Sequence, residues 1–80
     1  MKNTFFCARI EMSAFTITGY GSTKEEAEAV MRQGFTKHCN AFGCRFRYSN
    51  AETPEQYLEE NDWSVTELEL GKAYRDNEVI

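Results

Sequence analysis

Hydrophobic and polar residues alternate along residues 4–12, which is the pattern of a β-strand with one buried face. One side of this strand carries Phe6, Ala8, Ile10 and Met12, and the other side carries Phe5, Cys7, Arg9 and Glu11. A second alternating run over residues 14–19 places Phe15 and Ile17 on its inward side. We therefore expect an antiparallel hairpin with a short turn near Ser13.

From residue 22 the hydrophobic period lengthens to that of a helix. Ser22 and Thr23 are both N-cap residues, and each is followed three positions later by a glutamate, as in a capping box. The apolar stripe of this helix consists of Ala27, Val30, Met31, Gly34, Phe35 and His38. We expect the stripe to cover the sheet, with Gly34 at the point of closest approach. The helix should end near Asn40 or Gly43, which both tolerate a left-handed cap.

The second half of the chain predicts a strand over residues 44–48, a short helix over 54–60 and a strand over 63–74, followed by a loose tail. Thr53, Pro54 and Gln56 supply the N-cap, the first helical position and the capping-box partner of the short helix. In the last strand we expect the inward residues to be Leu68 and Leu70 and the outward ones to be Val65, Glu67 and Glu69.

These elements give the order β-β-α-β-α-β within a single domain, residues 1–80. The fold class this order predicts is α+β, a two-layer sandwich whose antiparallel sheet is covered on one face by the long helix. A hydrophobic fraction of 41% with six Phe, four Tyr and one Trp is sufficient for a globular core. The absence of a long apolar run and of a signal-peptide pattern predicts a soluble, cytoplasmic protein with no membrane partner.

Charge is distributed unevenly. The chain has a net charge of −4, and residues 52–69 hold seven acidic residues and no lysine or arginine. Two large aromatic residues lie within this stretch. An acidic surface with aromatic anchors is typical of an interface for a basic partner, whereas a solvated helix face and strand edge would produce the same run of charge. The predicted partner-binding residues are Glu52, Glu55, Tyr57, Glu59, Glu60, Asp62, Trp63, Glu67 and Glu69.

Catalytic and metal-binding signatures have little support. Cys7, His38, Cys39 and Cys44 are the ligand types of a zinc site, but no Cys-x-x-Cys spacing is present. Three cysteines fit reduced thiols better than a disulfide framework. The chain has no glycine-rich phosphate loop and no orienting group for a thiol–imidazole pair. We therefore expect a protein that is not an enzyme and that carries no metal or cofactor.

The face of the sheet opposite the long helix offers a second binding surface. Its expected residues are Phe5, Arg9, Thr16, Thr18, Arg45 and Arg47. Aromatic and arginine side chains on an open sheet bind single-stranded nucleic acid in some proteins. Arginines on an exposed sheet are also ordinary solubilising residues, and the negative net charge favours that interpretation.

The run Gly21-Ser22-Thr23-Lys24-Glu25-Glu26-Ala27, after a hairpin, resembles the helix start of HicB-type antitoxins, whose domain has a partial double-stranded-RNA-binding-like fold. The resemblance covers residues 4–40, and this chain lacks the DNA-binding domain appended to those antitoxins. In general character the chain also looks like small acidic inhibitors carried by phages, such as anti-CRISPR proteins. Both resemblances imply a non-enzymatic protein that inhibits a basic, nucleic-acid-acting partner without binding nucleic acid itself. The alternative is a small nucleic-acid-binding module that uses the open sheet face.

Overall fold

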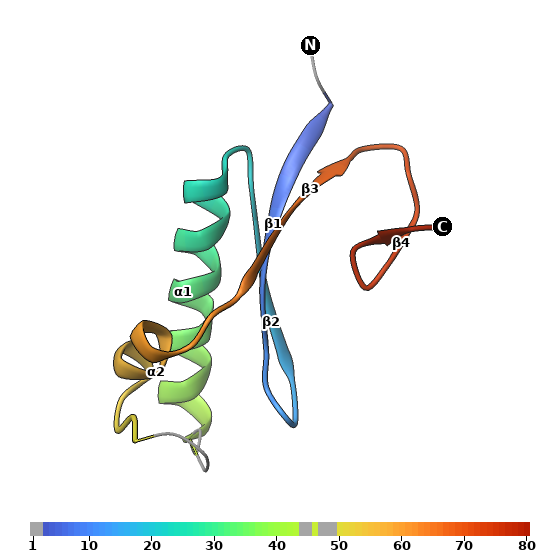
Figure 1. Ribbon diagram of the computed structural model, residues 1–80. Coiled ribbons are helices and arrows are strands. Elements are labelled where there is room, and N and C mark those ends of the chain that lie inside the picture. Colours follow the sequence, from blue (N-terminus) through green and yellow to red (C-terminus); the bar gives the residue numbers. More distant parts are fainter. Residues whose placement is uncertain (1–2, 44–45, 47–49) are drawn as a thin grey trace.

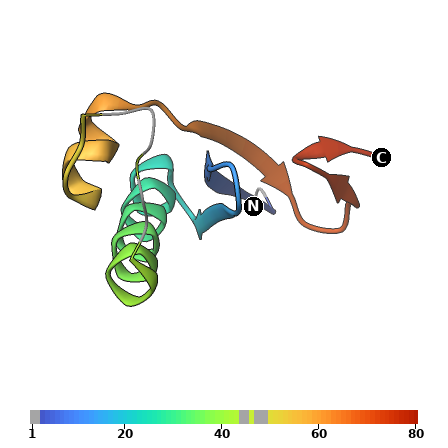
Figure 2. The ribbon, with the colours of Figure 1, turned by 90° about the horizontal axis from the view of Figure 1, so that it is seen from below.

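A long helix lies across an antiparallel sheet in the computed structural model, which describes residues 3–43, 46 and 50–80 (Figure 1). The elements in chain order are β1 (Thr4–Glu11), β2 (Thr16–Gly21), α1 (Lys24–Phe42), α2 (Pro54–Glu60), β3 (Ser64–Glu69), β4 (Tyr74–Arg75) and β5 (Glu78–Val79). The main sheet has the order β2-β1-β3, and α1 covers one of its faces. Seen from below, the β4–β5 hairpin lies on the opposite side of the sheet from α1 (Figure 2). The predicted α+β class is confirmed.

β1 is the central strand and pairs antiparallel with both neighbours. Its pairing with β2 places Ile10 opposite Ile17 on the face that α1 covers. The turn between these strands is closed by the backbone N–H of Met12, which donates to the carbonyl of Phe15 at 2.8 Å. The predicted hairpin is therefore confirmed, although β2 begins and ends two residues later than the sequence pattern indicates.

Both ends of α1 are capped by the residue types that the sequence indicates. The hydroxyl of Thr23 accepts a hydrogen bond from the N–H of Glu26 at 3.1 Å, and the Glu26 carboxylate accepts one from the N–H of Ser22 at 2.9 Å. At the other end Gly43 adopts the left-handed conformation with φ 66°, and its N–H donates to the carbonyl of Cys39. These bonds satisfy backbone groups that a helix end otherwise leaves unpaired.

The buried row of α1 is spaced by four residues. It consists of Ala27, Met31, Phe35 and Cys39. The prediction that Val30 is buried is wrong, because its side chain is 43% exposed. A row with this spacing inclines across the helix axis, so a sheet that follows the row leaves Val30 on the flank. His38, also assigned to the stripe, is half-buried between the rings of Phe15 at 4.5 Å and Phe42 at 4.8 Å.

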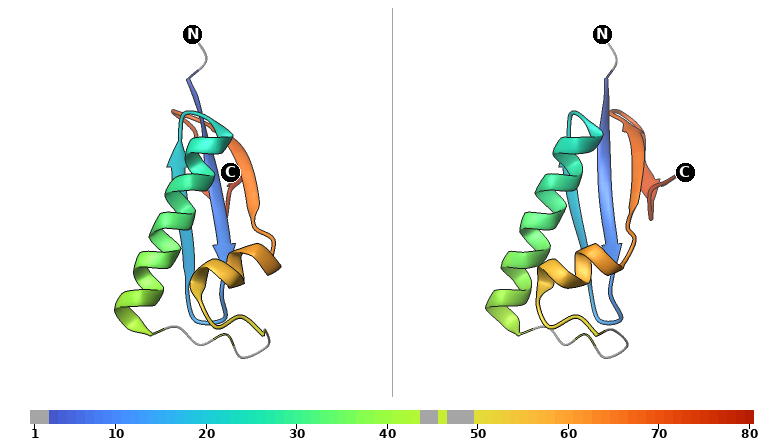
Figure 3. Two further views of the ribbon diagram at one scale, coloured as in Figure 1. Left: turned by 90° about the vertical axis from the view of Figure 1, so that its left-hand side faces the viewer. Right: turned by 60° about the vertical axis from the view of Figure 1, so that its left-hand side comes forward.

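Two glycines of β2 bring the strand and α1 together, an arrangement visible in side view (Figure 3). A Cβ atom at Gly19 would lie 2.3 Å from the backbone nitrogen of Met31, and one at Gly21 would lie 2.5 Å from the backbone nitrogen of Ala27. The helix backbone thus rests on strand backbone. The prediction that Gly34 serves the closest approach is wrong, since a Cβ there would meet only a methyl group of β2 at 3.7 Å.

The facing of β3 is the reverse of the prediction. Val65 is opposite Ala8 and packs against the core beneath α1, whereas Leu68 is opposite Phe5 on the other face. Leu68 is buried there, and Leu70 is 66% exposed. Sequence alternation cannot decide which alternate set of a strand faces a helix, because the pairing register with β1 decides it.

The end of the chain forms a small hairpin in place of the predicted continuous strand and loose tail. The chain turns at Gly71, whose φ is 84°, before β4 begins. Asp76 and Asn77 join β4 to β5 with φ angles of 50° and 65°. Two successive positive φ angles are typical of a type I′ turn, where Asn and Asp are favoured besides glycine. The strand predicted over residues 63–74 is therefore divided by a turn.

This hairpin covers part of the sheet face opposite α1. Cys7 on that face has no exposed surface, and the side-chain amide of Asn77 donates to its sulfur at 3.6 Å. The hydroxyl of Tyr74 accepts a hydrogen bond from the backbone N–H of Glu69 at 2.8 Å. A second, smaller buried region thus forms beneath the hairpin, in addition to the core beneath α1.

The strand predicted over residues 44–48 lies mostly outside the described residues, Phe46 being the exception. The ring of Phe46 is half-buried and stacks on the ring of Tyr57 from α2 at 4.8 Å.

Candidate partner-binding surface

Helix α2 has the predicted bounds and the predicted cap. The Thr53 hydroxyl accepts a hydrogen bond from the N–H of Gln56 at 3.2 Å, and the Gln56 side-chain carbonyl accepts one from the N–H of Glu52 at 2.8 Å. Pro54 occupies the start of the helix, where the missing N–H costs nothing. A helix of this length is not stable alone in water, so the capping bonds and packing against α1 must hold it.

Two side chains attach α2 to the rest of the molecule. Leu58 is buried at 4% exposure in the main core. The Tyr57 ring is half-buried and stacks on the ring of Phe35 from α1 at 5.6 Å. With these residues directed inward, the carboxylates of the segment are exposed to solvent. We call Glu52, Glu55, Glu59, Glu60 and Asp62 the α2 acidic surface.

The two aromatic residues predicted as partner anchors are not displayed on this surface. Tyr57 belongs to the stacked cluster around the core. Trp63 is half-buried against the core, and the guanidinium carbon of Arg32 lies 6.0 Å from its ring centroid. That distance is at the limit of a cation–π contact. Of the two aromatics, Trp63 lies directly after the acidic cluster, at the edge where α2 leads into β3.

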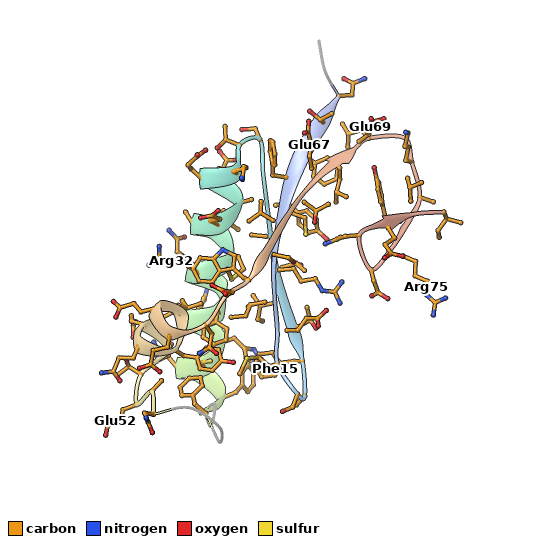
Figure 4. All side chains as sticks on the ribbon, in the orientation of Figure 1. Phe15, Arg32, Glu52, Glu67, Glu69 and Arg75 are labelled. Carbon is orange, nitrogen blue, oxygen red and sulfur yellow. The ribbon has the colours of Figure 1, made fainter. Side chains whose placement is uncertain are left out.

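The remaining predicted acids lie at the other end of the molecule. Figure 4 shows Glu67 and Glu69 near one end of the sheet and Glu52 near the opposite end, below α2. Glu69 forms an exposed ion pair with Lys72 at 3.1 Å. The structure therefore separates the acidic stretch of residues 52–69 into the α2 acidic surface and a second group on β3.

A groove that the sequence analysis did not identify runs between α1 and α2. We call it the α1–α2 groove, and its volume is about 840 Å³. Its lining consists of Ala29, Arg32, Gln33, Thr36, Lys37, Asn40 and Ala41 from α1 and Glu55 and Leu58 from α2. The signal in the sequence is the recurrence of small and polar residues at helical spacing on the side of α1 opposite its buried row. Only the placement of α2 turns that side into the wall of a groove.

The alternative surface on the sheet is less open than predicted. Arg9 is largely buried, and its guanidinium pairs with Glu11 at 2.9 Å and with Asp76 of the hairpin turn at 3.5 Å. A cation with two carboxylate partners is poorly placed to bind phosphate. The Phe5 and Tyr20 rings lie 5.9 Å apart on this face. Its exposed residues include Thr16 and Thr18. The other two predicted arginines, Arg45 and Arg47, lie outside the described residues.

The candidate zinc ligands are divided between different parts of the fold. Cys39 is buried in the core beneath α1, while Cys7 is buried on the other face of the sheet beneath the hairpin. Cys44 lies outside the described residues. Across residues 3–43, 46 and 50–80, no three His, Cys, Asp or Glu side chains are grouped to hold a metal ion. Within the same residues, neither helix has the length and apolar character needed to cross a bilayer.

No protein-family model, curated protein or solved structure matches this chain. The resemblance to HicB-type antitoxins therefore stays a prediction from the residues that carry it.

Proposed function

We propose that this chain is a non-catalytic inhibitor that binds a basic, nucleic-acid-acting protein through the α2 acidic surface. The observation that carries the proposal is the cluster of exposed carboxylates on one short helix and its two ends, with no lysine or arginine within residues 50–62. A protein surface that binds nucleic acid is rich in lysine and arginine. A compact acidic helix is complementary to such a surface and competes for it. The antitoxin and phage-inhibitor resemblances suggest the same class of protein.

The exposed carboxylates and the adjacent aromatic residue have different roles in this proposal. Exposed acids attract a basic partner over about 8–10 Å at physiological ionic strength and mainly raise the association rate. Slow dissociation needs an apolar contact that excludes water. Trp63 supplies that contact at the edge of the acidic cluster, whereas Tyr57 maintains the position of α2 from within the fold.

A matched pair of charge reversals tests the proposal. Glu59→Lys with Glu60→Lys changes the α2 acidic surface, and Glu67→Lys with Glu69→Lys makes the same change of net charge on β3. Lysines in the last turn of α2 interact favourably with the helix dipole, so the fold should be retained. We expect the α2 variant to lose at least about tenfold in affinity, which corresponds to about 1.4 kcal/mol. The β3 variant should stay near wild type.

The measurement has two stages. Proteins captured from host cells by the wild-type chain and by both variants identify a partner that only the α2 variant fails to retain. The purified partner is then titrated with a fluorescent oligonucleotide in the presence of each form of the chain. We expect wild type and the β3 variant to displace the oligonucleotide and the α2 variant to fail. Equal losses in the two variants, or direct binding of the oligonucleotide by this chain, would contradict the proposal.

A further inference from the structure

The α1–α2 groove presents both signs of charge side by side. α1 contributes Arg32 and Lys37, and α2 contributes Glu55, with Glu59 one helical turn further along the same side of α2. All of these side chains are exposed. Within residues 3–43, 46 and 50–80, no ion pair joins either of these cations to either of these carboxylates. The groove therefore keeps a basic wall and an acidic wall available to an occupant.

An occupant of one charge sign does not match this lining. A purely basic segment would meet Arg32 and Lys37, and a purely acidic segment would meet Glu55. Like charges placed opposite one another disfavour a complex. The groove is matched by a surface that has an acidic element beside a basic element in the reverse order. Rotation about a two-fold axis produces that reversal from the chain itself.

We propose that the α1–α2 groove is the interface of a symmetric dimer, in which the α2 carboxylates of each copy lie against the α1 cations of the other. Two-fold symmetry makes each such contact occur twice. The occupant of the groove is thus a second copy of this chain, and each copy completes the charge pattern of its partner.

The shape of the groove favours a helix as its occupant. Ala29 and Ala41 are small, and the intervening lining residues Gln33, Thr36 and Asn40 have polar side chains without rings. Leu58 from α2 adds an apolar surface to the lining. Small side chains on a helix allow another helix to approach at the short end of the usual interaxial range of about 8–10 Å. A second copy offers α1 and α2 for that approach.

This dimer goes beyond the proposed inhibitory function and constrains it. Glu55 and Glu59 belong both to the dimer contact and to the α2 acidic surface. A chain in the dimer therefore cannot present the same carboxylates to a basic protein, and binding such a protein separates the two copies.

The test uses the purified full chain and two charge-reversal variants. One variant is Arg32→Glu with Lys37→Glu, and the other is Glu55→Lys with Glu59→Lys. In either variant alone the facing walls have the same sign, and we expect at least a tenfold weaker self-association by analytical ultracentrifugation. Mixing the two variants pairs reversed α1 with reversed α2 and native α1 with native α2. The mixture should therefore associate to within a fewfold of wild type, and high salt should weaken both.

Each outcome decides the proposal. A wild-type chain that stays monomeric up to about 1 mM, weaker than about 4 kcal/mol of association, overturns it. Association of both variants at the wild-type level also overturns it, as does a mixture that fails to recover. Circular dichroism of each variant establishes that it is folded, and the single changes Lys37→Glu and Glu55→Lys replace a double variant that is not. A monomeric chain whose groove variants release a captured host protein would assign the groove to that protein instead. Because no partner protein is present, the result is independent of the proposed inhibitory function.

Discussion

Gly19 and Gly21 determine how closely α1 approaches the sheet. Each lies on β2 at a position where a Cβ atom would meet helix backbone at 2.5 Å or less. Side-chain contacts can relax by rotation, but a contact with backbone can relax only if a whole element moves. The two positions therefore require glycine for reasons of space.

Gly19→Ala and Gly34→Ala form a matched pair that tests this interpretation. Alanine at position 19 must displace α1, so we expect a loss of about 2 kcal/mol or more in the free energy of unfolding. Alanine at position 34 meets only a methyl group at 3.7 Å within a helix, and should stabilise the protein by about 0.5–1 kcal/mol. Urea denaturation of both variants measures the difference. Similar effects at the two positions would mean that α1 does not rest on β2 at Gly19.

Among the elements, α2 and the β4–β5 hairpin are the shortest and depend most on local geometry. α2 relies on the reciprocal bonds around Thr53 and on Leu58 in the core. The hairpin relies on a turn in which Asp76 and Asn77 both have positive φ angles. Each short element covers something important, α2 by forming one wall of the groove and the hairpin by burying Cys7.

Asn77→Val tests the hairpin. A β-branched residue is strained at a φ of 65°, so the turn should open and expose the thiol beneath it. In a Cys44→Ser background, we expect a thiol reagent to modify Cys7 of the folded Asn77→Val protein several times faster than in the parent. Cys39, beneath α1, should stay protected in both. Mass spectrometry of the labelled peptides distinguishes the two thiols.

The matched control for this experiment is Asn77→Gly, which keeps a residue tolerant of positive φ and removes the amide group. Its labelling rate at Cys7 should stay close to that of the parent. If valine and glycine accelerate labelling equally, the hydrogen bond to sulfur protects the thiol, and the turn conformation does not.

At the scale of the whole molecule, the two acidic groups lie toward opposite ends of a structure 42 Å in its longest dimension. That length is several times the distance over which salt screens exposed charges. The α2 acidic surface and the carboxylates of β3 therefore act on a partner as separate charges, although the sequence places them in one stretch.

The same comparison shows which features sequence reasoning reaches. Capping boxes and the boundaries of α2 are local signals, and they are confirmed at Thr23 and Thr53. The direction of Val65 and Leu68 depends on pairing with β1, which is distant in sequence. The α1–α2 groove likewise depends on where α2 docks. The β4–β5 turn was a local signal that sequence reasoning missed, since Asp76-Asn77 between two short extended segments suits a two-residue hairpin loop.

The central position of β1 also has a consequence for the order of folding. β1 finds β2 across a short turn and α1 directly afterwards, but its pairing with β3 joins Arg9 to Ser64 and encloses the whole intervening chain. The entropy lost in closing a loop rises with its length, so we expect β1, β2 and α1 to form the folding nucleus. Ile17→Ala should then slow folding, whereas Val65→Ala should mainly speed unfolding, as chevron kinetics of the two variants would measure. The reverse pattern would place β3 in the nucleus. Under the expected order, the wall that α2 gives to the groove is added last and is the first part lost when the protein opens.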